Sequence, residues 1–338
     1  MATLAPTPKS NYRGRLAPSP TGYLHVGHAR TFWTAYQRAR DAGGTLVMRM
    51  EDLDPDRSKQ IYADAAIEDL RWFGIRWQEG PDRDGAGRIS DRGGPFAPYI
   101  QSKRRAFHLA AWHSLLRRGY LYPCRCSRKD METALAAPHE NVRPEVQALA
   151  LLRASSRDSS GSRTVTQPTL NPGKLDLDDE PIYPGTCRNL AGQQQPGPAS
   201  ETPDGSNWRF RVPDGEVVEF EDGNLGHVRF VAGADFGDFV VWRRDGVPSY
   251  QLACVADDHA MGITEVVRGA DLLKSTARQI LLNRALGYKD PAWFHTKLVV
   301  DHNGRRLAKR YDALSLRALR QRGITPMNIL AAELPVEV

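Results

Sequence analysis

Short strand-like segments and amphipathic stretches alternate along the first 120 residues. Segments 12–17 and 45–50 read as strands, and apolar residues recurring three and four positions apart, as from Ala29 to Ala39, predict helices. The expected helices follow His28 up to 41–44, cover 58–73 with Ser58 as N-cap, and cover 101–118. A strand, a glycine-bearing turn, a helix, a strand and a helix begin a doubly wound α/β unit.

The pattern changes after residue 130. Residues 131–181 are rich in Ser, Pro, Arg and Asp, with a loop-like part at 155–174 and an Ala- and Leu-rich part of helical character at 146–152. A second polar stretch covers 193–207. Short alternating segments then predict one small antiparallel sheet, with strands at 208–212, 217–220, 227–231 and 239–242.

Mixed α/β character resumes near the C-terminus. The expected elements are a strand at 249–255, a helix at 272–286, a strand at 293–300 and a helix at 313–320. The chain is thus expected to be an α/β protein whose parallel sheet is split by an inserted, small α+β region and followed by a short helical tail. We place the two sheet halves at 1–120 and 246–300, the insertion at 121–245, and the final loop and tail at 301–338.

Composition narrows the class of protein. The 338 residues include 46 Lys and Arg against 40 Asp and Glu, a net charge of +6, and 37 of the basic residues are Arg. Arginine favours a nucleic-acid partner because it binds phosphate bidentately and stacks on planar rings, although a codon bias would give the same excess. Without a bilayer-spanning apolar run or a secretory leader, a cytoplasmic protein is expected. Four cysteines are too few for a disulfide scaffold.

The most informative chemistry lies where the first strand gives way to a helix. Residues 25–28 read H-V-G-H, so Gly27 permits a close approach of backbone or phosphate. The N–H groups of a helix N-terminus attract anions, and imidazoles donate hydrogen bonds to phosphate oxygens. Helix-start histidines also occur without a catalytic role, so the flanking residues decide the interpretation.

The flanking residues resemble a known family. Residues 15–28 read R-L-A-P-S-P-T-G-Y-L-H-V-G-H, similar to the signature of class I glutamyl-tRNA synthetases. Further matches follow in order at 48–54, 69–81, 248–259 and 262–271. The resemblance implies a Rossmann-like catalytic domain that activates L-glutamate with ATP, with Mg²⁺ accompanying the nucleotide.

The resemblance also implies an ATP site. The R-L-A-K-R sequence at 306–310 stands where the family has K-M-S-K-S, so Arg306 replaces the first lysine and Lys309 matches the second. The implied catalytic residues are His25, His28 and Lys309. The implied ATP-binding residues are Pro18, His25, Gly27, His28, Arg306 and Lys309.

A glutamate pocket is implied in the same way. The matching positions are Arg15, Ser19, Glu51, Tyr250 and Arg268. A side-chain carboxylate requires a guanidinium and an α-ammonium requires a carboxylate. We therefore expect Arg15 or Arg268 to bind the former and Glu51 the latter, with Tyr250 adding a hydroxyl. Cys254 stands where many members of the family carry Asn, a departure that leaves glutamate possible as the substrate.

A metal site is implied by the cysteines. The C-x-C pair Cys124 and Cys126, followed by Tyr183 and Cys187 in Y-P-G-T-C, resembles the zinc site of a truncated subgroup of this family. Three thiolates and a phenol oxygen would complete a tetrahedral shell for one structural Zn²⁺ per chain. Fifty-six residues separate Cys126 from Tyr183, far more than in the subgroup. Four reduced side chains without a metal are the alternative.

The subgroup also suggests an acceptor. Only 28 residues follow Arg310, too few for the anticodon-binding region of a full glutamyl-tRNA synthetase. Members of the truncated subgroup transfer glutamate to queuosine in the anticodon of tRNA(Asp). The expected partners are ATP, L-glutamate and queuosine-containing tRNA(Asp), with no membrane and a monomeric chain. A minimal enzyme that charges the 3′ end of tRNA(Glu) and a catalytically retired tRNA-binding relative remain as alternatives.

Overall fold

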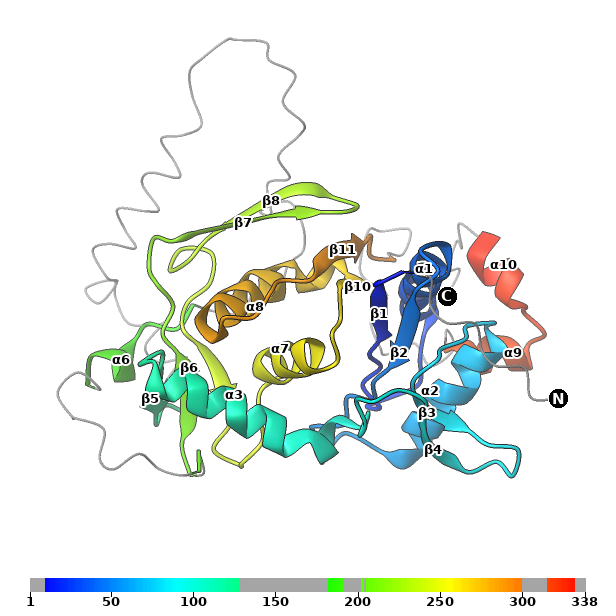
Figure 1. The fold of residues 1–338 in the computed structure, drawn as a ribbon, viewed down its shortest axis with the longest axis horizontal. Helices are drawn as coiled ribbons and strands as arrows, with labels where there is room; N and C mark the ends of the chain where they lie inside the picture. The colour runs from blue at the N-terminus through cyan, green and yellow to red at the C-terminus, as the bar shows by residue number, and fades with distance from the viewer. Residues whose placement is uncertain are drawn as a thin grey trace, which may run out of the picture. The chain divides into compact units, whose positions relative to one another are not determined.

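A computed structural model describes residues 10–127, 130, 182–190, 202–203, 205–299 and 315–331. Its helices and strands are labelled along the chain in Figure 1. The backbone contacts divide the chain into two compact units. Unit 1 comprises Met1–Arg105, Asp258–Ala270 and Pro291–Val338, and unit 2 comprises Ala106–Asp257 and Asp271–Asp290. The segment boundaries drawn from the sequence stay a prediction. The expected features at 131–181 and 306–310 lie outside the described residues.

Unit 1 is built on parallel strands. Strand β1 (Arg13–Leu16) pairs in parallel with β2 (Thr45–Met48), with Leu16 opposite Met48. Strand β10 (Glu265–Gly269) pairs in parallel with β11 (Ala292–Thr296) and lies beside β1. All four residues of β2 are buried, as in a parallel sheet covered on both faces. The predicted class of fold is confirmed.

Helix α1 (Val26–Asp41) makes the crossover from β1 to β2. Its buried residues Ala29, Phe32, Ala35 and Ala39 form one face that packs into a core with Leu16 and Met48. Basic residues occupy its last turn, where they complement the helix dipole. The helix begins three residues earlier than the hydrophobic pattern indicated, so His25 caps the helix and His28 lies in its first turn.

Helix α2 (Gln60–Trp72) follows the second strand, but its predicted N-cap is wrong. The N-cap is Lys59, whose carbonyl accepts hydrogen bonds from the N–H groups of Tyr62 and Ala63 at 3.0 and 3.2 Å. Ser58 instead belongs to a preceding turn, in which its N–H donates to the carbonyl of Asp54 at 2.8 Å. A serine before a helical pattern marks the vicinity of a helix start, and the turn here moves that start by one residue.

Several elements of unit 1 carry no strong sequence signal. The hairpin of β3 (Gly80–Arg83) and β4 (Ile89–Arg92) was not predicted, because its second strand is largely exposed and lacks apolar alternation. The short 3-10 helix η1 (Gln101–Arg104) leads into α3. Near the C-terminus, α9 (Leu316–Gln321) confirms a helix close to the predicted position, and α10 (Pro326–Ala331) follows it.

Unit 2 contains two separate antiparallel arrangements where one sheet was predicted. Strand β6 (Asn207–Phe210) pairs with both β5 (Leu121–Cys124) and β9 (Phe239–Trp242), whereas β7 (Val217–Asp222) and β8 (Gly226–Val231) pair with each other. The strands were found correctly but their pairing was not. Alternation indicates which face of a strand is buried and does not specify its neighbour.

The remaining elements are the helices α3 (Arg105–Arg117), α6 (Thr186–Leu190), α7 (Tyr250–Ala260) and α8 (Leu273–Leu286), and the short 3-10 helix η4 (Ala270–Leu272). The predicted strand at 249–255 is wrong, because these residues begin α7. Every residue from Gln251 to Asp258 is buried, and a short continuous apolar run does not distinguish a buried strand from a buried helix. None of the helices in the described part of the chain has the length and apolar character needed to cross a bilayer.

Candidate functional site

Two histidines form the N-terminal cap of α1. His25 is the N-cap residue, and its Nδ1 accepts a hydrogen bond from the N–H of Gly27 at 3.1 Å. The Nδ1 of His28 accepts one from the N–H of His25 at 3.3 Å, so the two imidazoles form a reciprocal capping box. Their rings stack with centroids 3.8 Å apart. The H-V-G-H sequence is therefore both a helix start and a fixed pair of imidazoles.

This cap defines which nitrogen carries the proton. A neutral imidazole has one N–H and one acceptor nitrogen. Because Nδ1 accepts a backbone hydrogen bond in both His25 and His28, the proton of each neutral ring lies on Nε2. Each ring can thus present an Nε2–H donor to a phosphate oxygen.

Gly27 provides the space that this arrangement requires. A Cβ at position 27 would lie 3.0 Å from Cε1 and 3.2 Å from Nδ1 of the His25 ring. A larger residue would therefore require the imidazole of His25 to shift by a few tenths of an ångström. The glycine therefore serves the packing of His25 as well as the approach of a ligand.

The loop before α1 is tied to the end of β2. The carbonyl of Pro18 accepts a hydrogen bond from the N–H of Glu51 at 3.0 Å, and the carbonyl of Leu16 accepts one from the N–H of Arg49 at 2.8 Å. Pro18 is buried and Ser19 is exposed. Two predicted binding positions, Ser19 and Glu51, are thereby held on adjoining backbone segments.

A chain of alternating charges lies at the ends of the parallel strands. The guanidinium of Arg49 donates to Oε1 of Glu51 at 2.9 Å and to Oδ1 of Asp258 at 2.5 Å. The Nε of Arg15 lies 3.6 Å from the same oxygen of Asp258. The order is Arg15, Asp258, Arg49 and Glu51, and all four side chains are buried. Arg49 and Asp258 therefore join two residues that were predicted to bind opposite ends of one substrate.

Arg15 presents a buried donor that remains available. Its NH1 donates to the carbonyl of Val267 at 2.9 Å, but its Nε makes no hydrogen bond to any of the described residues. Leaving a buried donor unsatisfied costs about 1–3 kcal/mol, which a bound carboxylate would recover. The role of Arg15 in binding the side-chain carboxylate of glutamate stays a prediction.

Arg268 has a different environment. Its Nε donates to Nε2 of His295 at 3.3 Å, which requires a neutral His295, and its guanidinium lies 5.0 Å from the ring centroid of Trp293. Both Arg268 and His295 are buried. The side chain of Arg268 is therefore held at the ends of β10 and β11 by contacts within unit 1.

The predicted residues differ in how far the structure describes them. Arg15, Ser19, Glu51 and Arg268 all belong to unit 1, whereas Tyr250 belongs to unit 2. Arg306 and Lys309 lie outside the described residues. The roles of all these residues stay predictions.

Sequence reasoning missed Arg49, Asp258 and His295. Arg49 and Asp258 lie within segments that carry the family resemblance, at 48–54 and 248–259, so the signal was present without a role attached to it. The contact between them joins positions far apart in the chain, which no local pattern predicts.

A separate cavity of about 140 Å³ adjoins this region of unit 1. It lies at the N-terminus of α2 and is lined by residues that include Met50, Asp52 and Lys59. Among the described residues that line it, neither Arg15 nor Arg268 appears. Asp52 accepts hydrogen bonds from the N–H and hydroxyl of Ser102 at 2.8 and 2.7 Å, so it is engaged in capping η1. The cavity is thus distinct from the alternating charges.

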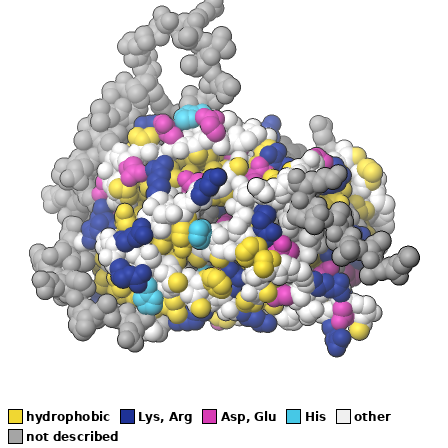
Figure 2. Space-filling model, viewed as in Figure 1, with side chains coloured by type: hydrophobic (Ala, Val, Ile, Leu, Met, Phe, Trp, Pro, Cys, Tyr) yellow, Lys and Arg dark blue, Asp and Glu magenta, His cyan; other side chains and the backbone are white. Residues whose placement is uncertain are grey.

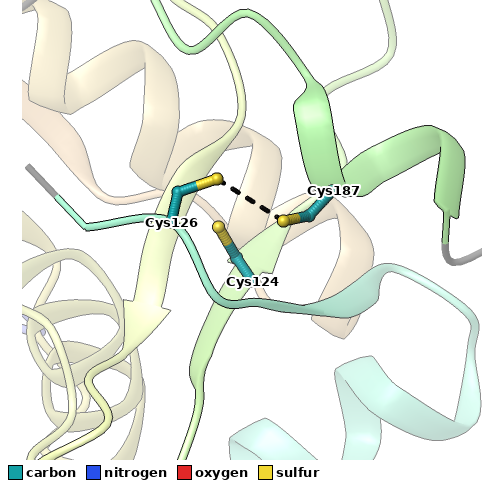
Figure 3. Close-up of side chains that lie close together, drawn as sticks. All are labelled: Cys124, Cys126 and Cys187. Atoms are coloured by element: carbon teal, nitrogen blue, oxygen red, sulfur yellow. Dashed lines mark hydrogen bonds between the residues drawn. The ribbon is translucent and has the colours of Figure 1, made fainter. Parts of the chain in front are cut away.

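Unit 2 contains the second candidate site. The thiols of Cys124, Cys126 and Cys187 point toward one another (Figure 3), and their sulfur atoms lie within 4.8 Å of one another. The hydroxyl of Tyr183 lies 3.4 Å from Sγ of Cys124 and 3.5 Å from Sγ of Cys126. The structure therefore gathers all four predicted ligands, despite the long segment between them.

Burial and hydrogen bonding affect these groups unequally. Burial raises the pKa of the Cys126 thiol to about 11 and also raises the pKa of Tyr183. Burial acts in the same direction on Cys187, yet hydrogen bonds from the N–H of Arg125 and from Tyr183 hold the pKa of this thiol below its usual value. A divalent cation at the centre would favour the thiolate form of every cysteine.

The donor set fits a zinc ion. Bond lengths of about 2.3 Å to sulfur and 2.0–2.2 Å to oxygen place tetrahedral ligand atoms roughly 3.5–3.8 Å apart. The Cys126 to Cys187 sulfur distance of 3.5 Å and the oxygen to sulfur distances of 3.4 and 3.5 Å lie close to this range. Soft thiolate donors in a closed group suit zinc better than a hard cation.

The family comparison assigns the chain to the class I aminoacyl-tRNA synthetases, with which its parallel strands and its helix capped by the H-V-G-H sequence agree. The sequence matches the family "tRNA synthetases class I (E and Q), catalytic domain" over residues 11–165 and 173–333. The chain belongs to this family and is a ligase. Class I synthetases use ATP with Mg²⁺.

Two relatives are similar over most of their length. The glutamyl-Q tRNA(Asp) synthetase of Nitratidesulfovibrio vulgaris is 42% identical over 94% of this chain and 83% of that protein. The enzyme of the same name from Symbiobacterium thermophilum is 42% identical over 94% of this chain and 84% of that protein.

Longer relatives are matched over about half of their length. Glutamate--tRNA ligase 2 of Acidithiobacillus ferrooxidans is 41% identical over 93% of this chain and 55% of that protein. The crystal structure of a glutamate tRNA ligase from Elizabethkingia meningosepticum, in complex with its amino acid, superposes with a TM-score of 0.59. That similarity extends over 89% of this chain and 52% of the ligase chain, at 27% identity.

Proposed function

We propose that this protein activates L-glutamate with ATP and transfers the glutamyl group to queuosine in the anticodon of tRNA(Asp). The observation that carries the proposal is the 42% identity to two glutamyl-Q tRNA(Asp) synthetases, over 83 and 84% of their lengths. The gathered Cys124, Cys126, Tyr183 and Cys187 group supports it, because the sequence resemblance links this pattern to the same subgroup.

Glutamate is bound by complementary charges in the proposed reaction. The α-ammonium meets Glu51, and the side-chain carboxylate meets Arg15 or Arg268. The available Nε of Arg15 supports its assignment. Arg49 and Asp258 fix the positions of Glu51 and Arg15 before the substrate arrives, so that little reorganisation is needed on binding. Ser19 and Tyr250 contribute hydroxyl groups.

The two histidines are assigned to the formation of glutamyl-adenylate. The α-carboxylate of glutamate attacks the α-phosphorus of ATP and pyrophosphate leaves. The Nε2–H groups of His25 and His28 donate to phosphate oxygens as charge develops, beside the N–H groups of α1. Pro18 and Gly27 shape the approach to this helix end, and Arg306 and Lys309 neutralise the departing pyrophosphate. Mg²⁺ accompanies ATP and offsets its charge. A queuosine hydroxyl then attacks the carbonyl carbon of the glutamyl-adenylate, so that an ester bond forms, the bond to the phosphate breaks, AMP leaves and the hydroxyl proton is released.

One Zn²⁺ per chain is assigned to Cys124, Cys126, Tyr183 and Cys187. When bound, the ion supplies structural cross-linking of β5 to the segment around α6. The two ligand pairs come from separate segments, which is typical of a structural zinc site.

The basic residues that could bind RNA are not gathered in one patch on the face shown in Figure 2. Lys and Arg side chains are spread over the described part of the face shown in Figure 2, among hydrophobic and acidic ones. Such a surface attracts a polyanion without defining its register. We therefore assign no single residue to the tRNA.

Two assays test the function. The enzyme should support exchange between ATP and pyrophosphate with glutamate and without tRNA. It should then transfer labelled glutamate to tRNA(Asp) that contains queuosine, but not to tRNA(Asp) without queuosine. Exchange that requires tRNA(Glu), with charging of its 3′ end, would establish the second candidate, which the 41% identity to a glutamate--tRNA ligase favours. Absence of exchange under every condition would indicate a retired relative.

Replacing Lys309 tests the pyrophosphate role. We expect Lys309→Ala to lose most of the exchange activity while the protein remains folded, because the departing charge loses a positioned cation. The matched control is Lys289→Ala, which removes an exposed lysine of unit 2 and should exchange at the wild-type rate. Wild-type exchange by Lys309→Ala would refute the assignment.

Replacing single cysteines tests the metal site. Elemental analysis of purified protein should find one zinc per chain in the wild type and a strongly reduced content in Cys187→Ala. Cys254→Ala is the control, since Cys254 is buried on α7 and does not belong to the group of three cysteines. The metal site is excluded if wild-type protein with intact thiols contains no zinc.

A further inference from the structure

Arg209 touches two of the four proposed metal ligands. It lies on β6 and is buried. Its Nε donates to Sγ of Cys124 at 3.3 Å, and its guanidinium carbon lies 3.8 Å from the ring centroid of Tyr183. Its NH1 donates to the carbonyl of Asp238 at 2.9 Å, which fixes the plane of the guanidinium.

The positive charge of Arg209 lies beside a group that becomes negatively charged when it binds a metal ion. A divalent ion with three thiolates has a net negative charge, and Cys124 and Tyr183 are buried. Buried negative charge requires a compensating cation, and arginine does not lose its proton in proteins. The neighbouring Arg188 pairs with the carboxylates of Asp214 at 2.8 Å and Asp238 at 3.3 Å, so its charge is shared with acidic groups. Arg209 brings its charge directly to a ligand sulfur.

We propose that Arg209 is a positioning residue of the metal site, which holds the Tyr183 phenol in place by stacking and compensates the charge of the thiolates. Arg209 is not itself a ligand, because a guanidinium has no acceptor atom. The inference rests on the proposed zinc site and adds a residue that the C-x-C and Y-x-x-x-C pattern does not contain. Groups that hydrogen-bond to metal ligands in this way usually tune both affinity and geometry.

Arg211 provides a matched control. It lies just beyond β6, and its guanidinium carbon is 5.1 Å from the ring centroid of Tyr122. It therefore also places a cation over a tyrosine ring in unit 2, but this tyrosine donates to Asp238 and is not one of the proposed ligands. If removing any stacked arginine lowers zinc affinity, both R209Q and R211Q should bind zinc more weakly. If the effect is specific to the metal site, only R209Q should do so.

The experiment measures zinc affinity on the full chain by competition with a chromophoric chelator. We expect R209Q to bind zinc about 10- to 100-fold more weakly than the wild type, as for other residues that hydrogen-bond to metal ligands. R211Q should bind as the wild type does. R209K keeps the charge but loses the planar stack on Tyr183, so its zinc affinity should lie between that of R209Q and that of the wild type. The absorption spectrum of the Co²⁺-loaded protein should change in R209Q, because the phenol moves, and should not change in R211Q.

The outcomes separate the two proposals. If the wild type binds no zinc, the metal site and the role of Arg209 both fail. If the wild type binds zinc and R209Q binds equally well with an unchanged Co²⁺ spectrum, only the role of Arg209 fails. Equal losses in R209Q and R211Q would also overturn it. Should R209Q not fold by circular dichroism, R209K decides, since wild-type affinity in that variant excludes the positioning role.

Discussion

Replacing Arg49 by Met is expected to lower the free energy of unfolding by about 3–5 kcal/mol, the usual cost of removing one partner from a buried ion pair. Arg49 is 0% exposed and donates to both Glu51 and Asp258. Its removal leaves two buried carboxylates without the cation that they share. Denaturant-induced unfolding, followed by circular dichroism, measures the change.

An exposed arginine provides the comparison. Arg40 pairs with Asp41 at 2.9 Å, and its side chain is 56% exposed. Arg40→Met should cost less than about 1 kcal/mol, because exposed ion pairs contribute little. Equal and small losses in the two variants would contradict the idea that Arg49 holds the alternating charges together.

A second substitution at Arg49 tests the glutamate pocket. In the folded fraction of Arg49→Lys, the KM for glutamate should rise more than the KM for ATP, because a lysine cannot donate in parallel to Glu51 and Asp258. An unchanged KM for glutamate would separate the Arg49 contacts from substrate binding and leave them a purely structural role.

Replacing the two histidines by residues that keep the helix cap is expected to slow glutamate activation by about 100- to 1,000-fold, the usual effect of losing a donor to developing charge. Asn is a favourable N-cap, and Gln at the third helical position maintains a capping box. His25→Asn and His28→Gln therefore remove the imidazole rings with their Nε2–H donors, leave amide N–H groups in different positions, and retain the hydrogen bonds that start α1. Pyrophosphate exchange measures the loss.

Stability measurements serve as the control for the histidine variants. Both should unfold at nearly the wild-type denaturant concentration, because the cap is preserved. His227→Gln, on the β7–β8 hairpin, should exchange at the wild-type rate. Slow exchange that is accompanied by an equal loss of stability would indicate that the histidines act only as caps.

The sequence predicted the parallel core well because burial and periodicity agree there. All four residues of β2 are buried and three of them are apolar, and the buried apolar residues of α1 recur with helical period. The helix α7 was mistaken for a strand because it is buried on every side over 251–258, so that no period is visible. The β3–β4 hairpin was missed for the opposite reason, since most residues of its second strand are exposed and no buried face gives an alternating pattern.

The candidate sites were predictable to different degrees. The family resemblance indicated His25, His28 and the four metal-site residues, and the structure brings each set together. The role of Asp258 was not predictable, because its contact with Arg49 spans 209 positions and depends on how β10 lies beside β1. The tautomer of the histidines was equally hidden, since it depends on the exact geometry of the helix end.

The contacts of the Tyr183 hydroxyl with Cys124 and Cys126 have a consequence for how this protein family tolerates insertions. They hold together the two ends of the 56-residue segment between Cys126 and Tyr183. Once the ends of a loop are fixed, each doubling of its length costs only about 0.6 kcal/mol of closure entropy. The free energy of closing this junction therefore depends only weakly on the length of the segment between Cys126 and Tyr183. A change in the length of this segment is therefore expected to leave the geometry of the four ligands unchanged.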